Sequence, residues 1–382
     1  MYNLETIIEE LMEESLRNSA KSYLSRGQFD IAKELYFKLL KVQKRLLVLD
    51  KDYYGSLVVK TLNSLAQIYK EENSYTLAIK YYKHAIFIME KMLNNDERTD
   101  FSILAQNYTS IGNLYRVEYK YEEAEYFYDK ALSIYNGLSF DKYKMEILSI
   151  YNYLSIICDE QNKFKETKDA YMGALNIYQS LVTDESDDYQ SELAMTLYKL
   201  ASLYFRHNRV NKAGEVYILA LEILLYLHQK EPIGYRATIA STFYHLGKIY
   251  TTQHEYVDGL SAYRASLNYY IELADENPMD YGSYIAMIFK DLASYYLSQN
   301  KMDMAEYFHF KLVNLYKELT LYNEYKYSLK LASTIIDGVR FYGQHTLSLY
   351  EAEIIIQSYM TEDIDDLLEE IECLRYEKIP VC

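Results

Sequence analysis

NYTSIGNLYRVEYKYEEAEYFYDKALSIYNGL, residues 107–138, contains two amphipathic helical segments separated by a short polar turn. Small residues such as Gly112 and Ala124 lie one or two helical turns from the large aromatic residues Tyr115 and Tyr128. This pattern lets two antiparallel helices approach closely while the large side chains fill the space between them. Because one hairpin cannot bury its apolar face alone, the stretch predicts a unit that needs copies of itself on either side.

The same pattern recurs along the chain every 46 residues, with one interval of 43. The position of Tyr115, which we call the anchor, recurs as Tyr23, Tyr69, Cys158, Tyr204, Tyr250 and Tyr296. Three residues before each anchor stands a small residue: Ala20, Ala66, Gly112, Ser155, Ala201, Gly247 and Ala293. Nine residues after it stand Ala32, Ala78, Ala124, Thr167, Ala213, Gly259 and Ala305, and thirteen after it Tyr36, Tyr82, Tyr128, Tyr171, Tyr217, Tyr263 and His309. Fifteen residues before four of the anchors stand Tyr143, Tyr189, Tyr235 and Tyr281, so the connecting loops belong to the repeat as well.

These positions resemble the tetratricopeptide repeat over roughly residues 16–320, although that repeat usually has a period of about 34 residues. The longer period is similar to that of the long-helix repeats in kinesin light chains and in bacterial adaptor and sensor proteins. It predicts helices of about 17–20 residues. The resemblance implies an all-α fold, a right-handed superhelix of helical hairpins in which the first helix of each pair lines a concave face.

The repeat register also predicts the domain organisation. Residues 1–15 are expected to be the start of a first helix or an N-terminal cap, with Glu9, Glu10, Glu13 and Glu14 facing water. Seven repeats are expected at residues 16–50, 58–93, 104–137, 147–182, 193–228, 239–274 and 285–320. A degenerate repeat is expected at 321–360. Residues 361–382 are expected to form an acidic capping helix and tail, with an acidic docking tail as the alternative.

Composition narrows the classes of partner. The net charge of −16 disfavours nucleic acid and anionic membranes, since phosphate binding relies on basic surfaces. Many of the 46 tyrosines occupy repeat positions, which favours core packing over base stacking.

The N-terminus does not resemble a signal peptide, and no apolar run approaches the ~18 residues of a membrane span. The three cysteines lack metal-ligand spacing, and Cys158 is expected to be buried, which suggests a cytoplasmic protein. The bias toward Asn, Lys, Ile and Tyr suggests a bacterial source.

The sequence carries no motif for catalysis. It contains no glycine-rich phosphate loop, no His-Glu-x-x-His, no Cys-x-x-Cys and no Gly-x-Ser-x-Gly. The seven histidines are scattered without ligand spacing. We therefore expect a non-enzymatic protein with no catalytic residue, no metal and no cofactor.

The family resemblance places four positions of each first helix in the concave groove: six and two residues before the anchor, and one and two after it. Seven of the residues at these positions are basic and three are acidic, whereas the whole chain has 40 basic and 56 acidic residues. This excess of cations predicts an acidic or carboxylate-bearing peptide as partner. The partner-binding residues expected on this basis are Arg17, Lys21, Asn63, Gln67, Lys70, Asn113, Arg116, Asn152, Tyr198, Phe205, Arg206, Tyr244, Lys248 and Lys290.

Three interpretations of these positions remain open at this stage. Four residues resemble the carboxylate clamp of chaperone-binding repeats: Asn63, Lys70, Asn113 and Arg116. Three others could form an aromatic pocket that anchors a partner side chain: Tyr198, Phe205 and Tyr244. The same positions could also be an ordinary solvated helix face.

The function expected from the sequence is that of a protein-interaction scaffold that binds a partner peptide or helix in its groove. One alternative is a peptide-sensing regulatory protein. The other is an accessory repeat subunit of a bacterial defence or signalling enzyme complex.

Overall fold

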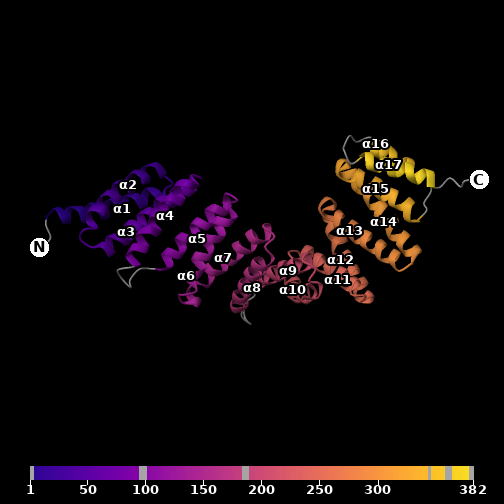
Figure 1. Ribbon diagram of the computed structural model, residues 1–382, viewed down its shortest axis with the longest axis horizontal. Coiled ribbons are helices and arrows are strands. Elements are labelled where there is room, and N and C mark those ends of the chain that lie inside the picture. The colour runs from indigo at the N-terminus through magenta and orange to yellow at the C-terminus, as the bar shows by residue number, and fades with distance from the viewer. Residues whose placement is uncertain (1–3, 94–100, 183–188, 343–345, 358–363, 378–382) are drawn as a thin grey trace, which may run out of the picture. The chain divides into compact units, whose positions relative to one another are not determined.

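The computed structural model describes residues 4–93, 101–182, 189–342, 346–357 and 364–377. These residues form α-helices, α1 to α17, joined by short turns, and the described segments contain no strand (Figure 1). The chain divides into two compact units, Met1–Ser180 and Leu181–Cys382, and each is described by itself.

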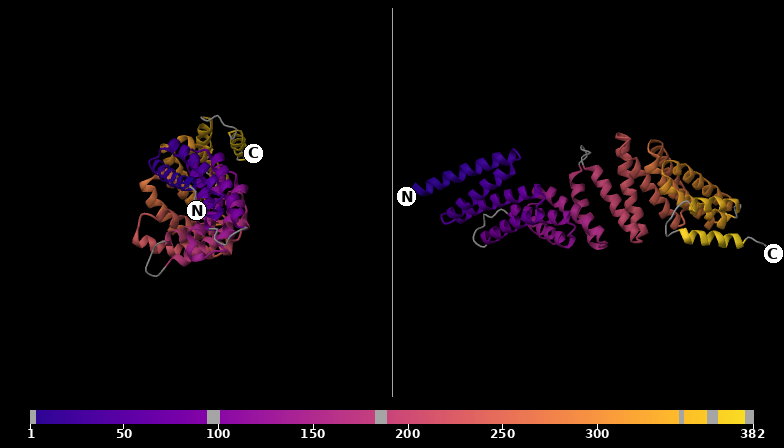
Figure 2. Two further views of the ribbon diagram at one scale, coloured as in Figure 1. Left: turned by 90° about the vertical axis from the view of Figure 1, so that its left-hand side faces the viewer. Right: turned by 90° about the horizontal axis from the view of Figure 1, so that it is seen from above.

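The first unit consists of four helical hairpins. Its helices are α1 (Leu4–Ser25), α2 (Phe29–Leu46), α3 (Lys51–Glu71), α4 (Tyr75–Leu93), α5 (Phe101–Val117), α6 (Tyr121–Tyr135), α7 (Phe140–Glu160) and α8 (Phe164–Leu181). In the first three of these hairpins, the second helix packs against its own first helix and against the first helix of the next hairpin, as α2 does against α1 and α3. These hairpins therefore follow one another in chain order, as the right-hand view of Figure 2 also shows.

The second unit continues with three hairpins of the same kind: α9 (Gln190–Arg206), α10 (Val210–Lys230), α11 (Arg236–Thr252), α12 (Tyr256–Glu276), α13 (Pro278–Ser298) and α14 (Met302–Tyr322). Three further helices follow: α15 (Glu324–Tyr342), α16 (Thr346–Gln357) and α17 (Ile364–Glu377). Helix α17 packs on α15 and α16 and buries Ile371 and Leu374 against their apolar side chains. This end of the helical stack is therefore covered by a helix whose own sequence is acidic.

The helix bounds agree with the repeat register. Each first helix ends two residues after its anchor, and each second helix begins six residues after it, as at Tyr115, Val117 and Tyr121. The small residues of the repeat pattern and the large residue thirteen positions after each anchor are buried in every hairpin, with Tyr128 and Tyr217 fully enclosed, whereas the tyrosine anchors are half-buried. Helices of the hairpins run from 15 residues in α6 to 22 in α1, a somewhat wider range than the spacing predicts. The expected all-α repeat fold is confirmed.

The turn inside each hairpin follows one backbone rule. The residue four positions after the anchor always has a positive φ, with values from 55° at Asn162 to 71° at Gly27. The next amide then donates to the carbonyl of the anchor, for example from Arg209 N to Tyr204 O at 2.8 Å. This bond closes the end of the first helix and satisfies a carbonyl that would otherwise lack a partner. The sequence contains the signal, since four of these positions are asparagine: Asn73, Asn162, Asn208 and Asn300.

Two expectations about single residues have opposite outcomes. Cys158 is buried as expected, and burial raises the pKa of its thiol to about 12. Glu13 was expected to face water and is instead buried. Its carboxylate accepts a hydrogen bond from Gln43 Nε2 of α2 at 2.9 Å and lies 3.7 Å from Arg17 Nε. Glu13 therefore links α1 to α2 and does not face water.

Within the described segments, none of the helices combines the length and the apolar character that a membrane crossing requires.

Candidate functional site

The residues predicted to bind a partner all lie on the first helices of the hairpins: α1, α3, α5 and α7 in the first unit, and α9, α11 and α13 in the second. The repeat register places them there because all four groove positions fall in the last three turns of a first helix. Since they belong to two separate units, we describe their surroundings unit by unit.

In the first unit, Asn113 and Arg116 meet at the contact between two hairpins. Asn113 Oδ1 accepts a hydrogen bond from the hydroxyl of Tyr128 at 2.7 Å. The guanidinium of Arg116 lies 4.7 Å from the ring centroid of Tyr153 on α7. The rings of Tyr128 and Tyr153 stack with centroids 5.7 Å apart. Both predicted residues therefore contribute to packing between α5, α6 and α7.

The other clamp candidates are not joined to this cluster. Asn63 Oδ1 on α3 is buried and has no hydrogen-bond partner, and Lys70 is exposed. Among the described residues, no hydrogen bond, ion pair or ring contact connects either of them to Asn113 or Arg116. The structure thus brings together one half of the clamp that the sequence suggests.

The remaining predicted residues of the first unit divide into engaged and unengaged side chains. Asn152 Nδ2 donates to the Tyr178 hydroxyl at 3.0 Å, Gln67 donates to Glu71, and Arg17 pairs with Glu13. Lys21 and Lys70 are exposed, and neither forms an ion pair with any residue in the described part of the chain. Among the predicted groove cations of this unit, these two lysines are therefore exposed and without an ion pair in the described residues.

In the second unit, Tyr198, Phe205 and Tyr244 surround a residue that the sequence analysis did not identify, His245. Its ring lies parallel to that of Tyr217, with centroids 5.2 Å apart and an interplanar angle of 7°. Phe205 and Tyr244 approach it edge-on, each at 5.3 Å. Burial, together with nearby Lys248, lowers the pKa of His245 to about 4, so the ring is neutral. His245 fills the centre of the aromatic cluster, in which Tyr217 and Tyr244 are buried and the other rings are half-buried.

Lys248 is also engaged. Its Nζ lies 3.5 Å from Asp291 Oδ2, and the Tyr244 hydroxyl donates to the same oxygen at 2.8 Å. Asp291 therefore neutralises a cation that the sequence assigns to the groove. Arg206 is exposed at the end of α9.

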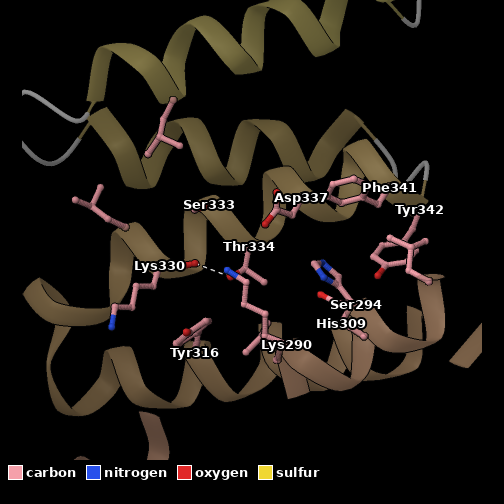
Figure 3. Close-up of a pocket in the computed structure, with 15 residues that line it drawn as sticks. Lys290, Ser294, His309, Tyr316, Lys330, Ser333, Thr334, Asp337, Phe341 and Tyr342 are labelled. Carbon is pink, nitrogen blue, oxygen red and sulfur yellow. Dashed lines mark hydrogen bonds between the residues drawn. The ribbon is translucent and has the colours of Figure 1, made fainter. Parts of the chain in front are cut away.

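An open pocket of about 650 Å³ lies between α13, α14 and α15. Lys290 and Ser294 line it from α13, at the positions six and two residues before the anchor. Lys330, Ser333, Thr334 and Asp337 line it from α15, as Figure 3 shows. Leu297, Leu312, Tyr316 and Phe341 give it an apolar wall. Predicted groove positions thus border a real hollow in the last complete repeat.

His309 is the unusual residue of this pocket. It occupies the position that is tyrosine in every earlier hairpin, is 4% exposed, and its Nε2 has no hydrogen-bond partner. Burial lowers its pKa to about 4, so the imidazole is neutral at ordinary pH. The break in the tyrosine series at His309 is a sequence signal that could have identified the pocket.

The charges of the pocket favour an anion. Lys290 and Lys330 contribute two cations, whereas Asp337 is the carboxylate that lines it. Burial raises the pKa of Asp337, and the nearby charges of Lys290 and Arg340 oppose this rise. The pocket can therefore hold a carboxylate between flexible ammonium groups and hydroxyl donors.

The described residues contain no group of His, Cys, Asp or Glu side chains that could hold a metal ion. No protein-family model matches the sequence, and no curated protein matches it.

Solved structures of helical-repeat proteins are similar to this chain. BtubC (BKLC) from P. vanneervenii is 21% identical over 62% of this chain and 89% of its own, with a TM-score of 0.41. A tetratricopeptide-repeat protein from Cytophaga hutchinsonii is 14% identical over 78% of this chain and 94% of its own, with a TM-score of 0.46. A signal transduction ATPase with a tetratricopeptide repeat sensor, from Pyrococcus horikoshii, is 15% identical over 98% of this chain, with a TM-score of 0.48. The chain spans 55% of the length of that ATPase.

Proposed function

From the premise that the chain is an array of tetratricopeptide-type repeats, we propose that it is a protein-interaction scaffold that binds an acidic segment of a partner polypeptide. The binding site of this proposal is the pocket between α13, α14 and α15, which we call the α13–α15 pocket. The observation that supports it most is the meeting of two lysines with a buried, unpartnered imidazole in an open hollow.

Each part of the pocket has a role in this proposal. A partner carboxylate, from an acidic side chain or a chain terminus, lies between Lys290 and Lys330. Because Lys330 lies on the exposed surface of α15 and Lys290 on that of α13, both ammonium groups can move to the ligand without a cost in burial. Ser294 and Ser333 supply hydroxyl donors, and the apolar wall accommodates a neighbouring side chain of the peptide.

His309 supports selectivity for a group that donates or accepts one hydrogen bond. A neutral imidazole has one donor and one acceptor nitrogen. An unpaired buried nitrogen costs roughly 1–3 kcal/mol, so a ligand that satisfies Nε2 recovers part of this cost. The tyrosine of the earlier hairpins would fill the same space with a larger ring. Histidine in place of tyrosine in this hairpin therefore creates space, and its unpaired Nε2 lies at the wall of the pocket.

The experiment is a selection from a random peptide library displayed on phage, carried out on the full chain and in parallel on Lys290→Glu/Lys330→Glu. We expect the wild-type chain to enrich peptides rich in Asp and Glu, and the double variant to lose that enrichment. Lys212→Glu/Lys311→Glu is the matched control, because both of these lysines are exposed and lie outside the pocket. Their substitution changes the net charge by the same amount as the pocket variant does. Enrichment of the same acidic peptides by both double variants would contradict the assignment of the pocket.

A further inference from the structure

The N-terminal helix α1 leaves an apolar face without a partner. Leu4, Ile7, Ile8, Leu11 and Met12 are all more than 40% exposed, and they recur at the spacing of one side of a helix. In an open stack of repeats, the terminal helices need a polar outer face for solubility. Helix α17 covers the last helices of the second unit, whereas no described residue covers this face of α1.

The other hairpins show what this face normally contacts. The residue eleven positions before the anchor is at most 8% exposed in the six later hairpins, where it is Val58, Leu104, Ile147, Leu193, Ile239 or Ile285. Its equivalent in the first hairpin, Met12, is 45% exposed. Fifteen positions before the anchor, Tyr54 is 6% exposed and its equivalent Ile8 is 48% exposed. The face of α1 therefore has the composition of an interior helix surface without its cover.

Within each unit, the cover of a later hairpin is the second helix of the preceding hairpin. Tyr54 and Leu57 of α3 pack with Val42 and Leu46 of α2. Tyr143 of α7 packs against Tyr135 of α6 with ring centroids 5.4 Å apart, and Tyr281 of α13 against Tyr270 of α12. Thr61 Oγ1 of α3 donates to Gln43 Oε1 of α2 at 3.0 Å. Its equivalent on α1 is the exposed hydroxyl residue Ser15. A helix with an apolar stripe therefore fits the face of α1.

The charges at the border of the α1 face indicate which kind of helix could pack on it. The segment Leu4–Glu14 contains five glutamates and no lysine or arginine. At 100° per residue, Glu5 and Glu14 fall on opposite borders of the apolar face, and both are exposed. Their equivalents on α3 are lysines, Lys51 and Lys60. The border of this face is therefore acidic, which suits a helix with basic residues beside its apolar stripe.

A second copy of the chain does not supply such a helix at its ends. A second α1 would place glutamates against glutamates, and the sequence of α17 contains six acidic residues and one arginine. We propose that the face of α1 formed by Leu4, Ile8, Leu11, Met12 and Ser15 is a docking surface for a basic amphipathic helix of a partner protein. The partner helix packs as a second helix of the array does, and extends the stack at its N-terminal end. This surface is separate from the α13–α15 pocket and independent of the acidic ligand proposed there.

The test uses a synthetic helical peptide with leucines on one face and lysines on both sides of that face. Two control peptides are a scrambled sequence of the same composition and a version with glutamate in place of lysine. Fluorescence anisotropy measures binding to the full chain, and hydrogen exchange locates the protected helix. We expect protection of α1, and an affinity at least about tenfold lower for both control peptides.

Variants of exposed residues connect the result to the face. Leu11→Gln/Met12→Gln is expected to weaken binding about tenfold without lowering the melting temperature, because neither side chain is buried in the free chain. Glu5→Lys/Glu14→Lys is expected to reverse the preference toward the glutamate peptide. Val257→Gln, at an 82% exposed apolar residue elsewhere, is the control that leaves binding unchanged. Equal binding of the scrambled peptide, or unchanged binding by Leu11→Gln/Met12→Gln, would overturn the proposal. So would a concentration-dependent dimer in light scattering that the same double variant abolishes, since a second copy would then be the occupant.

Discussion

Gly112 and Tyr128 contact each other so closely that no side chain fits between them. A Cβ atom added at Gly112 would lie 2.8 Å from Cδ1 and Cε1 of the Tyr128 ring. The same relationship recurs between Gly247 and Tyr263, where the nearest distance would be 2.9 Å. The approach of the first helix to the second thus depends on a small residue facing a large one, which is the pattern that defines the repeat.

Replacing either glycine with leucine should therefore overpack the hairpin. We expect Gly112→Leu and Gly247→Leu each to lower the free energy of unfolding by about 1–3 kcal/mol, measured by urea denaturation. The better helix propensity of leucine offsets less than about 1 kcal/mol of this loss. Gly234→Leu is the control, because no atom lies within 4 Å of a Cβ at that position. An unchanged urea midpoint in both hairpin variants would show that the helix contact is misassigned.

A substitution at the turn residue Tyr119 should increase the stability of the chain. It has a φ of 58°, a conformation that costs a side-chain-bearing residue about 1–2 kcal/mol, and its ring is 79% exposed. Tyr119→Gly should raise the free energy of unfolding by about 0.5–1 kcal/mol, after the greater entropy of unfolded glycine is counted. Tyr119→Ala loses the same ring but keeps the backbone cost, so it should give no gain. Equal stabilities of the two variants would mean that the turn does not impose this conformation.

Stability should fall as the pH drops from about 6.5 toward 4. Burial lowers the pKa of both His245 and His309 from 6.5 to about 4, so between these values the unfolded chain binds protons that the folded chain does not. Unfolding is therefore favoured as the pH decreases, by up to about 3 kcal/mol for His245. The variant His245→Phe keeps an aromatic ring but cannot titrate.

The measurement is the free energy of unfolding of wild type and His245→Phe at several pH values in this range. The carboxylates titrate in both proteins, so their contribution cancels in the comparison. The wild-type chain should lose stability more steeply than the variant as the pH decreases. Parallel curves would contradict the burial of a neutral His245.

Charge reversal at Lys21 and Lys70 tests whether the first unit also binds acidic segments. If acidic segments also bind along α1 and α3, Lys21→Glu/Lys70→Glu should weaken that binding without affecting the fold, since neither residue forms an ion pair in the described structure. Arg116→Glu is a less selective change because Arg116 packs on Tyr153. Isothermal titration with the peptides selected on the wild-type chain distinguishes the two units. Binding that depends only on Lys290 and Lys330 would restrict the acidic site to the second unit.

The helix bounds could be predicted from the sequence because they depend on local spacing. The anchors, such as Tyr115, set where each first helix ends and each second helix begins. The partners of individual polar side chains could not be predicted in this way. Glu13 pairs with Gln43, 30 residues away, and an amphipathic pattern on α1 gives no indication of that contact.

The candidate site, too, could be predicted from the sequence only in part. The register placed Lys290 on the face of α13 that lines the pocket, but the pocket also includes residues from α15, where the repeat pattern weakens. His245 could not be recognised from the sequence because scattered histidines carry no ligand spacing, and its importance comes from the neighbouring rings. His309 is marked in the sequence only by the break in the tyrosine series, and its burial beside Tyr342 depends on the fold. The exposed face of α1 became visible only when each of its positions was compared with its buried equivalents, such as Met12 with Val58.

The most direct test of the proposed scaffold function is the affinity of one selected acidic peptide for three proteins: wild type, Lys290→Glu/Lys330→Glu and Lys212→Glu/Lys311→Glu. The proposal predicts a loss of at least about tenfold for the pocket variant, a loss of about twofold or less for the control, and weaker binding to wild type with added salt. Equal affinities of the two double variants, or affinity independent of salt, would contradict it.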